Sequence, residues 1–442
     1  MSRLINPFIY SRAVTPAEFL GRETELRRLF SRLATGQSTA IIGQPHVGKT
    51  STLNYVMEPS SRQIWFGPEF DRDLFCVLDA QMLRSVETQA EFWTHALKPL
   101  ADALAREPLK DLPTLLLAYT TAQQNRFGNF VLERLFTELK TSGGRYMLFL
   151  DEFDDLLSHP VLNSAEFYGG LRSLASRSAG LVLMLGSRRD VEQLNNLTQS
   201  LNPHGSPYFN VFTQITLGPL SNKAFMELLD RASDRFDEQD RRYITVVSGR
   251  YPFLAQAGAA KLWEAHDEDL KESRRYESAG RELYAEARQH FADTWRVWSN
   301  ETRKAITAVA LSQIPRLLGD HKFLISELVE KLSDYEPELE ALETFGMLTR
   351  NSDGERVITQ GAFLWWLTDE LKRNVRDDAA FGSWLQAQEM DGLFTRKEQQ
   401  KVGQAAQSIL AAAGKGATTL IESFAKGMGE GAVAPLLKQM GL

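Results

Sequence analysis

The segment from residue 43 to 50 reads Gly-Gln-Pro-His-Val-Gly-Lys-Thr, and it constrains the fold more than any other part of the chain. It has the spacing GxxxxGK[ST] of a phosphate-binding loop, between an apolar run at Thr39–Ile42 and a helical pattern that begins at Ser51. A bend of this kind directs backbone N–H groups and a helix N-terminus at one point. The sequence therefore predicts a nucleoside triphosphate site, whose candidate binding residues are Gly43, Gln44, Pro45, His46, Val47, Gly48, Lys49, Thr50 and Ser51.

Two residues of the loop have separate expected roles. Lys49 supplies a positive charge to the outer phosphates, and the Thr50 hydroxyl completes the coordination of Mg²⁺. The alternative is a glycine-rich turn that matches the pattern by chance. ATP or ADP with Mg²⁺ is the expected ligand set.

Two carboxylates follow the apolar run at residues 146–150. A continuous apolar run is typical of a strand buried on both faces of a parallel sheet, so Asp151 and Glu152 should emerge at its carboxyl end beside the phosphates. Asp151 is the candidate Mg²⁺ ligand, and Glu152 the candidate group that orients and polarises the attacking water. Asp154 and Asp155 are expected to form a solvated acidic turn.

A further apolar run at residues 181–185 ends in Gly-Ser-Arg-Arg-Asp. Arg188 is the candidate sensor of the γ-phosphate, because a guanidinium forms charge-assisted hydrogen bonds to phosphate that are lost on hydrolysis. The candidate catalytic residues are thus Glu152, Asp151, Lys49 and Arg188. The alternative for Arg188 and Arg189 is pairing with an acidic surface residue.

Five strand candidates alternate with helical patterns, at residues 39–42, 74–78, 146–150, 181–185 and 212–217. This alternation predicts an α/β fold with a parallel sheet covered on both faces. With the two nucleotide motifs, the fold class is that of a P-loop NTPase of the ASCE type. A helical lid, a winged helix and a helical C-terminal tail are expected to follow the sheet.

Composition limits the class of protein. The chain has 442 residues, 43% of them hydrophobic, which is ample for two or three domains with their own cores. A net charge of −7 argues against a surface that grips nucleic acid throughout. The single cysteine excludes a disulfide framework, and the sequence has neither an apolar signal core at its start nor 18 consecutive apolar residues. We expect a cytoplasmic protein.

Several short motifs resemble AAA-like ATPases, particularly the signal-transducing STAND branch. The segment 19–26, Phe-Leu-Gly-Arg-Glu-Thr-Glu-Leu, is similar to the element that lies over the adenine in that family, which implies a role for Gly21 and Arg22. The segment 248–256 is similar to one whose proline packs near the base, here Pro252, although Arg250 replaces a usual glycine. Asn-Pro-Phe at 6–8, the Asp-Glu-Phe-Asp run, Ser187-Arg188 and the segment 215–220 also match. The resemblance covers about residues 5 to 370.

The expected domains are the P-loop core at 1–220, a helical lid at 221–296, a winged helix at 297–372 and a tail at 373–442. The winged helix is read from helical patterns at 300–311, 322–332 and 336–345 and a hairpin around residues 351–354. Its third helix is acidic and would repel DNA phosphates. A protein-binding or intramolecular module is therefore favoured over DNA binding.

The tail carries an amphipathic pattern between residues 402 and 428, with many small residues and few charges on its polar face. Three interpretations stay open: packing on the ATPase or on a second copy, contact with a membrane surface, and binding of a separate effector. A homo-oligomer or a protein partner is expected.

The sequence as a whole predicts a STAND-like switch that binds ATP, hydrolyses it slowly, and controls assembly or engagement of a partner or effector. A role in microbial defence is implied only by the resemblance. The alternatives are an AAA-like DNA-loading or transposition-type ATPase and a nucleotide-regulated effector that acts on membranes.

Overall fold

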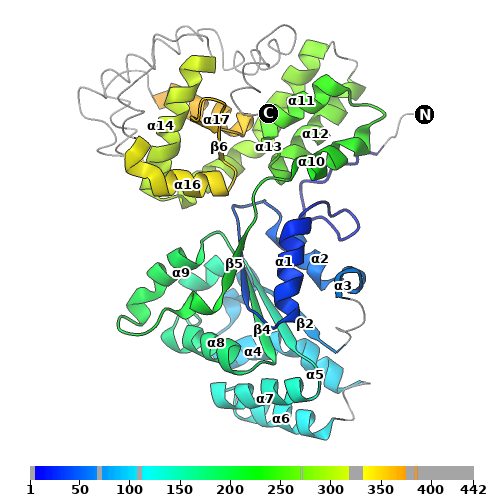
Figure 1. Cartoon of the computed structure of the whole chain (residues 1–442), viewed down its shortest axis with the longest axis vertical. Helices are drawn as coiled ribbons and strands as arrows, with labels where there is room; N and C mark the ends of the chain where they lie inside the picture. The colour runs from blue at the N-terminus through cyan, green and yellow to red at the C-terminus, as the bar shows by residue number, and fades with distance from the viewer. Residues whose placement is uncertain are drawn as a thin grey trace. The chain divides into compact units, whose positions relative to one another are not determined.

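The computed structural model describes residues 5–66, 72–106, 112–268, 270, 272–317, 332–374, 383 and 386. The chain divides into two compact units (Figure 1). The α/β unit comprises Ala13–Gln44 and Gly48–Leu217. The helical unit comprises Met1–Arg12, Pro45–Val47 and Gly218–Leu442. The expected helix at 322–332, apart from Leu332, and nearly all of the expected tail at 373–442 lie outside the described residues.

The α/β unit is built on one parallel five-stranded sheet in the order β2-β3-β4-β1-β5. Its strands are β1 (Thr39–Ile42), β2 (Leu74–Asp79), β3 (Tyr146–Asp151), β4 (Leu181–Ser187) and β5 (Thr213–Thr216). Every residue of β3 and β4 is buried, so both faces of the central sheet are covered, as the apolar runs predict. The α/β P-loop fold predicted from the sequence is confirmed.

One helix, α1 (Glu23–Ala34), precedes the first strand of this sheet, and the other helices of the unit connect its strands. These are α2 (Lys49–Met57), α3 (Pro59–Phe66), α4 (Gln89–Ala96), α5 (Lys98–Leu104), α6 (Pro113–Gln124), α7 (Asn129–Thr141), α8 (Ala165–Arg177) and α9 (Val191–Thr198). A short 3-10 helix η3 (Phe153–Ser158) follows β3. At the amino end of β3, the Arg145 guanidinium donates to the buried Asp73 carboxylate at 2.8 Å and to the carbonyls of Leu33 and Ala34. These contacts tie α1 to the start of β3.

The helical unit contains α10 (Asn222–Leu229), α11 (Glu238–Ser248), α12 (Pro252–Asp267), α13 (Glu272–Val297), α14 (Asn300–Leu317), α16 (Glu336–Thr344) and α17 (Gly361–Asn374), with the antiparallel hairpin β6 (Leu348–Arg350) and β7 (Arg356–Ile358). Asp237 caps α11 through a reciprocal capping box, and Pro252 occupies the first turn of α12, where its missing N–H costs nothing.

One aromatic cluster joins residues that the sequence analysis divides between a lid and a winged helix. Phe291 and Trp295 of α13 pack against Phe363 and Trp366 of α17 at ring-centroid distances of 5.4 to 6.1 Å. Burial of such large apolar rings holds the two segments in a common core. Helices α14 and α16 and the hairpin fall within residues 297–372, where the winged helix is expected. The winged-helix arrangement itself stays a prediction.

Candidate functional site

The carboxyl ends of three neighbouring strands meet at one edge of the sheet. Ile42 of β1 is in register with Ser187 of β4, and Leu150 of β3 is in register with Leu185 of β4. The Gly43 N–H donates to the Ser187 carbonyl at 3.0 Å, which fixes the start of the phosphate loop beside the end of β4. The sheet therefore brings together the loop, the carboxylates after β3 and the arginine after β4.

The loop turns directly into α2. Gly48 precedes the helix with φ 101° and ψ 26°, in a region that side chains with a Cβ rarely adopt. Lys49 is buried, and its Nζ donates to the carbonyls of Gly43 at 2.9 Å and Gln44 at 3.4 Å. Burial lowers the pKa of Lys49, while the carboxylates of Glu152 and Asp151 oppose that shift. A buried ammonium folded across the loop is suited to bind phosphate oxygens.

The tip of the loop, Pro45–Val47, belongs to the helical unit and contacts residues of that unit. The Tyr251 hydroxyl donates to the Pro45 carbonyl. The ring of His46 lies 5.1 Å from that of Phe253 and 4.9 Å from that of His290. Burial lowers the pKa of His290 to about 3, so this ring is neutral at ordinary pH. The sequence gave no indication of a role for His290, since a lone histidine on a long helix carries no motif.

Thr50 and Asp151 lie in direct contact. The Thr50 Oγ1 donates to the Asp151 Oδ2 at 2.6 Å. Burial raises the pKa of Asp151, and the hydrogen bonds from Thr50 and from the Glu152 backbone N–H oppose this shift. Mg²⁺ prefers oxygen ligands, of which a hydroxyl and a carboxylate are a common pair beside phosphates. The residues present therefore fit the ion, and Thr50 and Asp151 would hold it.

Gly186 of β4 leaves the space that Asp151 occupies. A Cβ at this position would lie 2.5 Å from the Asp151 Oδ1, closer than real contacts allow. The sequence analysis gave this glycine no role. The available signal was a glycine within an apolar strand, which marks a close approach of another group.

Glu152 and Arg188 form an ion pair. An Arg188 terminal nitrogen donates to the Glu152 Oε2 at 2.9 Å, with both side chains partly exposed. Glu152 has φ 47° and ψ 44°, the left-handed region that is uncommon for residues other than glycine. The structure places both predicted residues at the site, and it shows that Arg188 pairs with the predicted water-orienting carboxylate. Pairing with an acidic residue was the alternative that the sequence left open for Arg188, without Glu152 as the named partner.

The prediction of a solvated acidic turn is wrong for Asp154. Its side chain is only 7% exposed, and it accepts hydrogen bonds from the Arg188 backbone N–H and from the Arg189 guanidinium, each at 2.8 Å. Asp155 is more exposed and pairs with Arg84 at 3.1 Å. The turn after β3 is folded against the end of β4, and this contact between distant segments keeps Asp154 from solvent.

The segment before α1 packs against the helix that follows the loop. The Ser51 hydroxyl accepts a hydrogen bond from the Val14 N–H at 3.2 Å. Gly21 and Arg22 both have left-handed φ values, 71° and 67°, and Arg22 is buried at the start of α1. Pro252 belongs to the helical unit. The roles of Gly21, Arg22 and Pro252 toward a base stay predictions.

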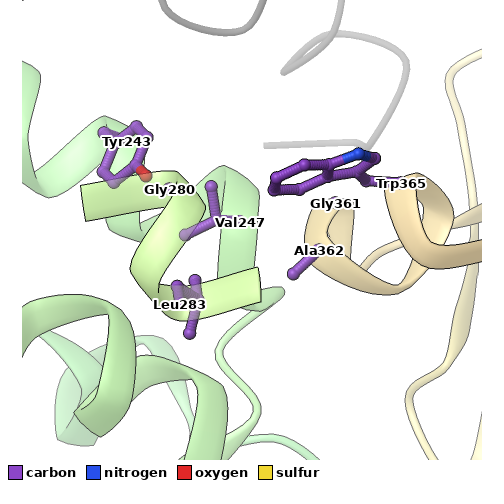
Figure 2. Close-up of a pocket in the computed structure, with 7 residues that line it drawn as sticks. All are labelled: Tyr243, Val247, Gly280, Leu283, Gly361, Ala362 and Trp365. Carbon is purple, nitrogen blue, oxygen red and sulfur yellow. The ribbon is translucent and has the colours of Figure 1, made fainter. Parts of the chain in front are cut away.

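A small pocket elsewhere in the helical unit has no such chemistry (Figure 2). It lies where α17 meets α11 and α13, and Figure 2 shows Val247, Leu283, Ala362 and the Trp365 ring around it. The lining is almost entirely hydrocarbon. In the part of the chain that the structure describes, no group of His, Cys, Asp and Glu side chains forms a metal cluster. The edge of the sheet, where Lys49, Thr50, Asp151, Glu152 and Arg188 converge, is the candidate site.

Comparisons with known proteins agree with this geometry. Residues 18–184 match the family model described as an AAA ATPase domain. The Walker-type ATPase Paby2304 of Pyrococcus abyssi is similar in structure, with a TM-score of 0.51 and 15% identity over 82% of this chain and 99% of that chain. At this identity the likeness concerns the fold. The α/β unit has the fold of a P-loop NTPase and is similar to an AAA ATPase domain over residues 18–184.

Two ORC proteins of Aeropyrum pernix show weaker likeness. The ORC2 protein, in ADPNP–ADP complexes, has a TM-score of 0.44 and 13% identity over 81% of this chain and 97% of its own. The ORC1 protein, in complex with DNA, has a TM-score of 0.37 and 16% identity over 81% of this chain and 94% of its own. No curated protein matches the sequence significantly.

Proposed function

We propose that this protein is a nucleotide switch that binds ATP with Mg²⁺, hydrolyses it slowly to ADP and phosphate, and controls assembly or the engagement of a protein partner. The observation that carries the proposal is the convergence of Lys49, Thr50, Asp151, Glu152 and Arg188 at the carboxyl edge of three adjacent strands. This edge is where open α/β sheets bind their ligands.

Each of these side chains has a distinct task in the proposed reaction. The Lys49 ammonium leaves its loop carbonyls for the outer phosphate oxygens, whose charge matches it. Thr50 and Asp151 would hold the Mg²⁺ ion, which when bound would neutralise charge on the phosphates. The Glu152 carboxylate accepts a hydrogen bond from the attacking water and takes its proton as the bond to phosphorus forms. The bond between the γ-phosphorus and the oxygen that bridges to the β-phosphate breaks, ADP leaves with that oxygen, and inorganic phosphate is the second product.

The pairing of Glu152 with Arg188 supports slow turnover and a response to the nucleotide state. The guanidinium occupies the Oε2 of Glu152, so this oxygen can orient water only after the pair opens. A γ-phosphate offers Arg188 a competing anionic partner, whereas ADP does not. Binding of ATP would thus release Glu152, and loss of phosphate would restore the ion pair.

The charges of the hairpin support a protein partner over DNA. The Arg356 guanidinium, 9% exposed, donates to the carboxylates of Glu336 at 2.9 Å and of Glu343. The Arg350 Nε lies 3.2 Å from the Glu343 carboxylate. Glutamates of α16 therefore already neutralise both arginines, which leaves little net positive charge for phosphates of nucleic acid. Retention on DNA at moderate salt would instead favour the DNA-loading alternative.

The finer assignment to a STAND-like switch, with a lid at 221–296, a winged helix at 297–372 and a possible defence role, rests on the sequence motifs. The tail remains a proposed element for self-association or effector binding, in the cytoplasm or at a membrane surface. In the described part of the chain, no helix is long and apolar enough to cross a bilayer. Contact of the tail with a membrane is tested by flotation of the full chain with anionic liposomes.

The experiment that tests the proposal measures oligomeric state by light scattering with ADP and with a non-hydrolysable ATP analogue. The same measurement is made on the chain without residues 391–442. A mass that differs between the two nucleotides, and only in the full chain, supports the switch. Identical masses with both nucleotides, in a protein shown to bind them, would contradict it.

A further inference from the structure

We propose that Asp154 is a positioning residue of the nucleotide site: it fixes the end of β4 so that Arg188 can reach both Glu152 and a γ-phosphate. This inference rests on the proposed function and adds to it a residue that acts through Arg188. The sequence assigns Asp154 to a solvated turn, whereas the structure buries it between two arginines.

The residues at the end of β4, Ser187 to Arg189, form a tight turn, called the hook below. The buried Ser187 hydroxyl accepts from the Arg189 N–H at 3.0 Å and donates to the Arg189 carbonyl at 2.8 Å. The two oxygens of Asp154 then hold this hook from the side of β3. Its Oδ2 accepts from the Arg188 N–H, and its Oδ1 accepts from the Arg189 guanidinium, each at 2.8 Å. One carboxylate thus anchors two successive residues.

This anchor governs where the Arg188 side chain points. Among the described residues, no acceptor lies within hydrogen-bond distance of the buried Arg188 Nε. The guanidinium contacts Glu152 through a terminal nitrogen, so its direction depends on the backbone from which it extends. A long arginine side chain amplifies a small rotation of its backbone into a displacement at the guanidinium. Loss of the bond from Asp154 to the Arg188 N–H would therefore misplace the guanidinium.

Asp155 provides a matched control. It is the next carboxylate in the same turn, and it pairs with Arg84, whose side chain is 76% exposed. An exposed pair of this kind contributes little to stability. Asp155→Asn removes the same charge one residue away without touching Ser187, Arg188 or Arg189.

The test uses the full chain with Mg²⁺ and measures the turnover of ATP and the Kd of fluorescent ATP and ADP. Asp154→Asn should lower kcat and the preference for ATP over ADP by about 10-fold each, since a misplaced phosphate-binding group costs this much or more. The Kd of ADP should not change. Asp155→Asn should match the wild type in all three quantities.

A double-mutant cycle separates positioning from stability. In an Arg188→Ala background, Asp154→Asn should cause no further loss of ATP preference, because the group that it positions is gone. An equal loss in both backgrounds, with a lowered melting temperature, would overturn the inference and make Asp154 structural. If Asp154→Asn does not fold, Asp154→Glu keeps the charge but moves the carboxylate relative to the Arg188 N–H, and wild-type ATP preference in that variant would overturn the inference.

The outcomes distinguish this inference from the proposed function. A wild-type chain that binds neither nucleotide overturns both. A wild-type chain that binds ATP without hydrolysing it overturns slow ATPase activity, and the preference for ATP over ADP then still tests Asp154. Wild-type turnover and preference in Asp154→Asn overturn the positioning role alone.

Discussion

Gly186→Ala tests whether the close approach of β4 to Asp151 is required for the site. The new Cβ would lie 2.5 Å from the Asp151 Oδ1 and 3.5 Å from its Cα and Cγ. The carboxylate has little freedom to move away, because its other oxygen accepts from Thr50 at 2.6 Å and Oδ1 itself accepts from the Glu152 N–H at 3.0 Å. Both strands are buried along their whole length, so the backbone has no free side toward which to shift.

The expected magnitude has two parts. Overpacking in a buried sheet should lower the free energy of unfolding by about 1 to 3 kcal/mol. Displacement of the Asp151 carboxylate by roughly 1 Å should weaken the Mg²⁺-dependent part of ATP binding on the order of 10²-fold. The two effects arise from one contact and should appear together in this variant.

The assay combines chemical denaturation with titration of fluorescent ATP, in Mg²⁺ and in a chelator. Gly169→Ala is the control, since its Cβ would meet only Tyr208 at 3.7 Å, an ordinary contact within α8. That variant should equal the wild type in nucleotide binding and be as stable or slightly more so. A Gly186→Ala protein with unchanged stability and unchanged Mg²⁺-dependent affinity would refute the reasoning.

Arg145→Ala should lower the free energy of unfolding by about 3 kcal/mol, because it leaves the buried Asp73 carboxylate without its partner. Chemical denaturation of Arg145→Ala and of the double variant Arg145→Ala/Asp73→Asn measures this loss. If the double variant recovers no stability, the unpaired carboxylate is not the cause. Burial lowers the pKa of His290 to about 3, below its value of about 6.5 in the unfolded chain. Between these two pH values the unfolded state binds more protons than the folded state. The free energy of unfolding therefore falls as the pH is lowered through this range, by up to about 1.4 kcal/mol per pH unit. His290→Phe should flatten this dependence in denaturation curves, and equal slopes in both proteins would show that another group is responsible. Deletion of residues 391–442 should leave ATP affinity intact and abolish self-association in light scattering; a truncated chain that is less stable yet assembles normally would make the tail structural.

The sheet was predictable because its central strands are continuous apolar runs. All five strands lie within two residues of the predicted positions, including the fully buried β3 and β4. The loop and the pair Asp151 and Glu152 were predictable because their spacing reflects local chemistry at strand ends. Such features depend on a few consecutive residues, and the sequence carries them directly.

The pairings within the site were not predictable, because they depend on how distant segments meet. The contact of Arg188 with Glu152 and the burial of Asp154 follow from the register of β3 and β4, which a single sequence does not specify. Gly186 acquires its role only once Asp151 lies beside it. Acidic turns and glycines within strands occur in many proteins without a functional role. The local sequence around Asp154 or Gly186 therefore does not indicate the contact that each residue makes in the fold.

The measurement that tests the account most directly is steady-state ATP hydrolysis, with Mg²⁺, by the wild type, Glu152→Gln and Lys49→Ala, each with a parallel titration of ATP binding. The wild type should hydrolyse ATP slowly, and Glu152→Gln should bind ATP while turnover falls on the order of 10²-fold or more, because a positioned base is lost. Lys49→Ala should lose nucleotide binding, because the buried charge at the loop is removed. Equal rates for the wild type and Glu152→Gln, in preparations shown to bind ATP, would contradict the assignment of this edge of the sheet as the site of hydrolysis.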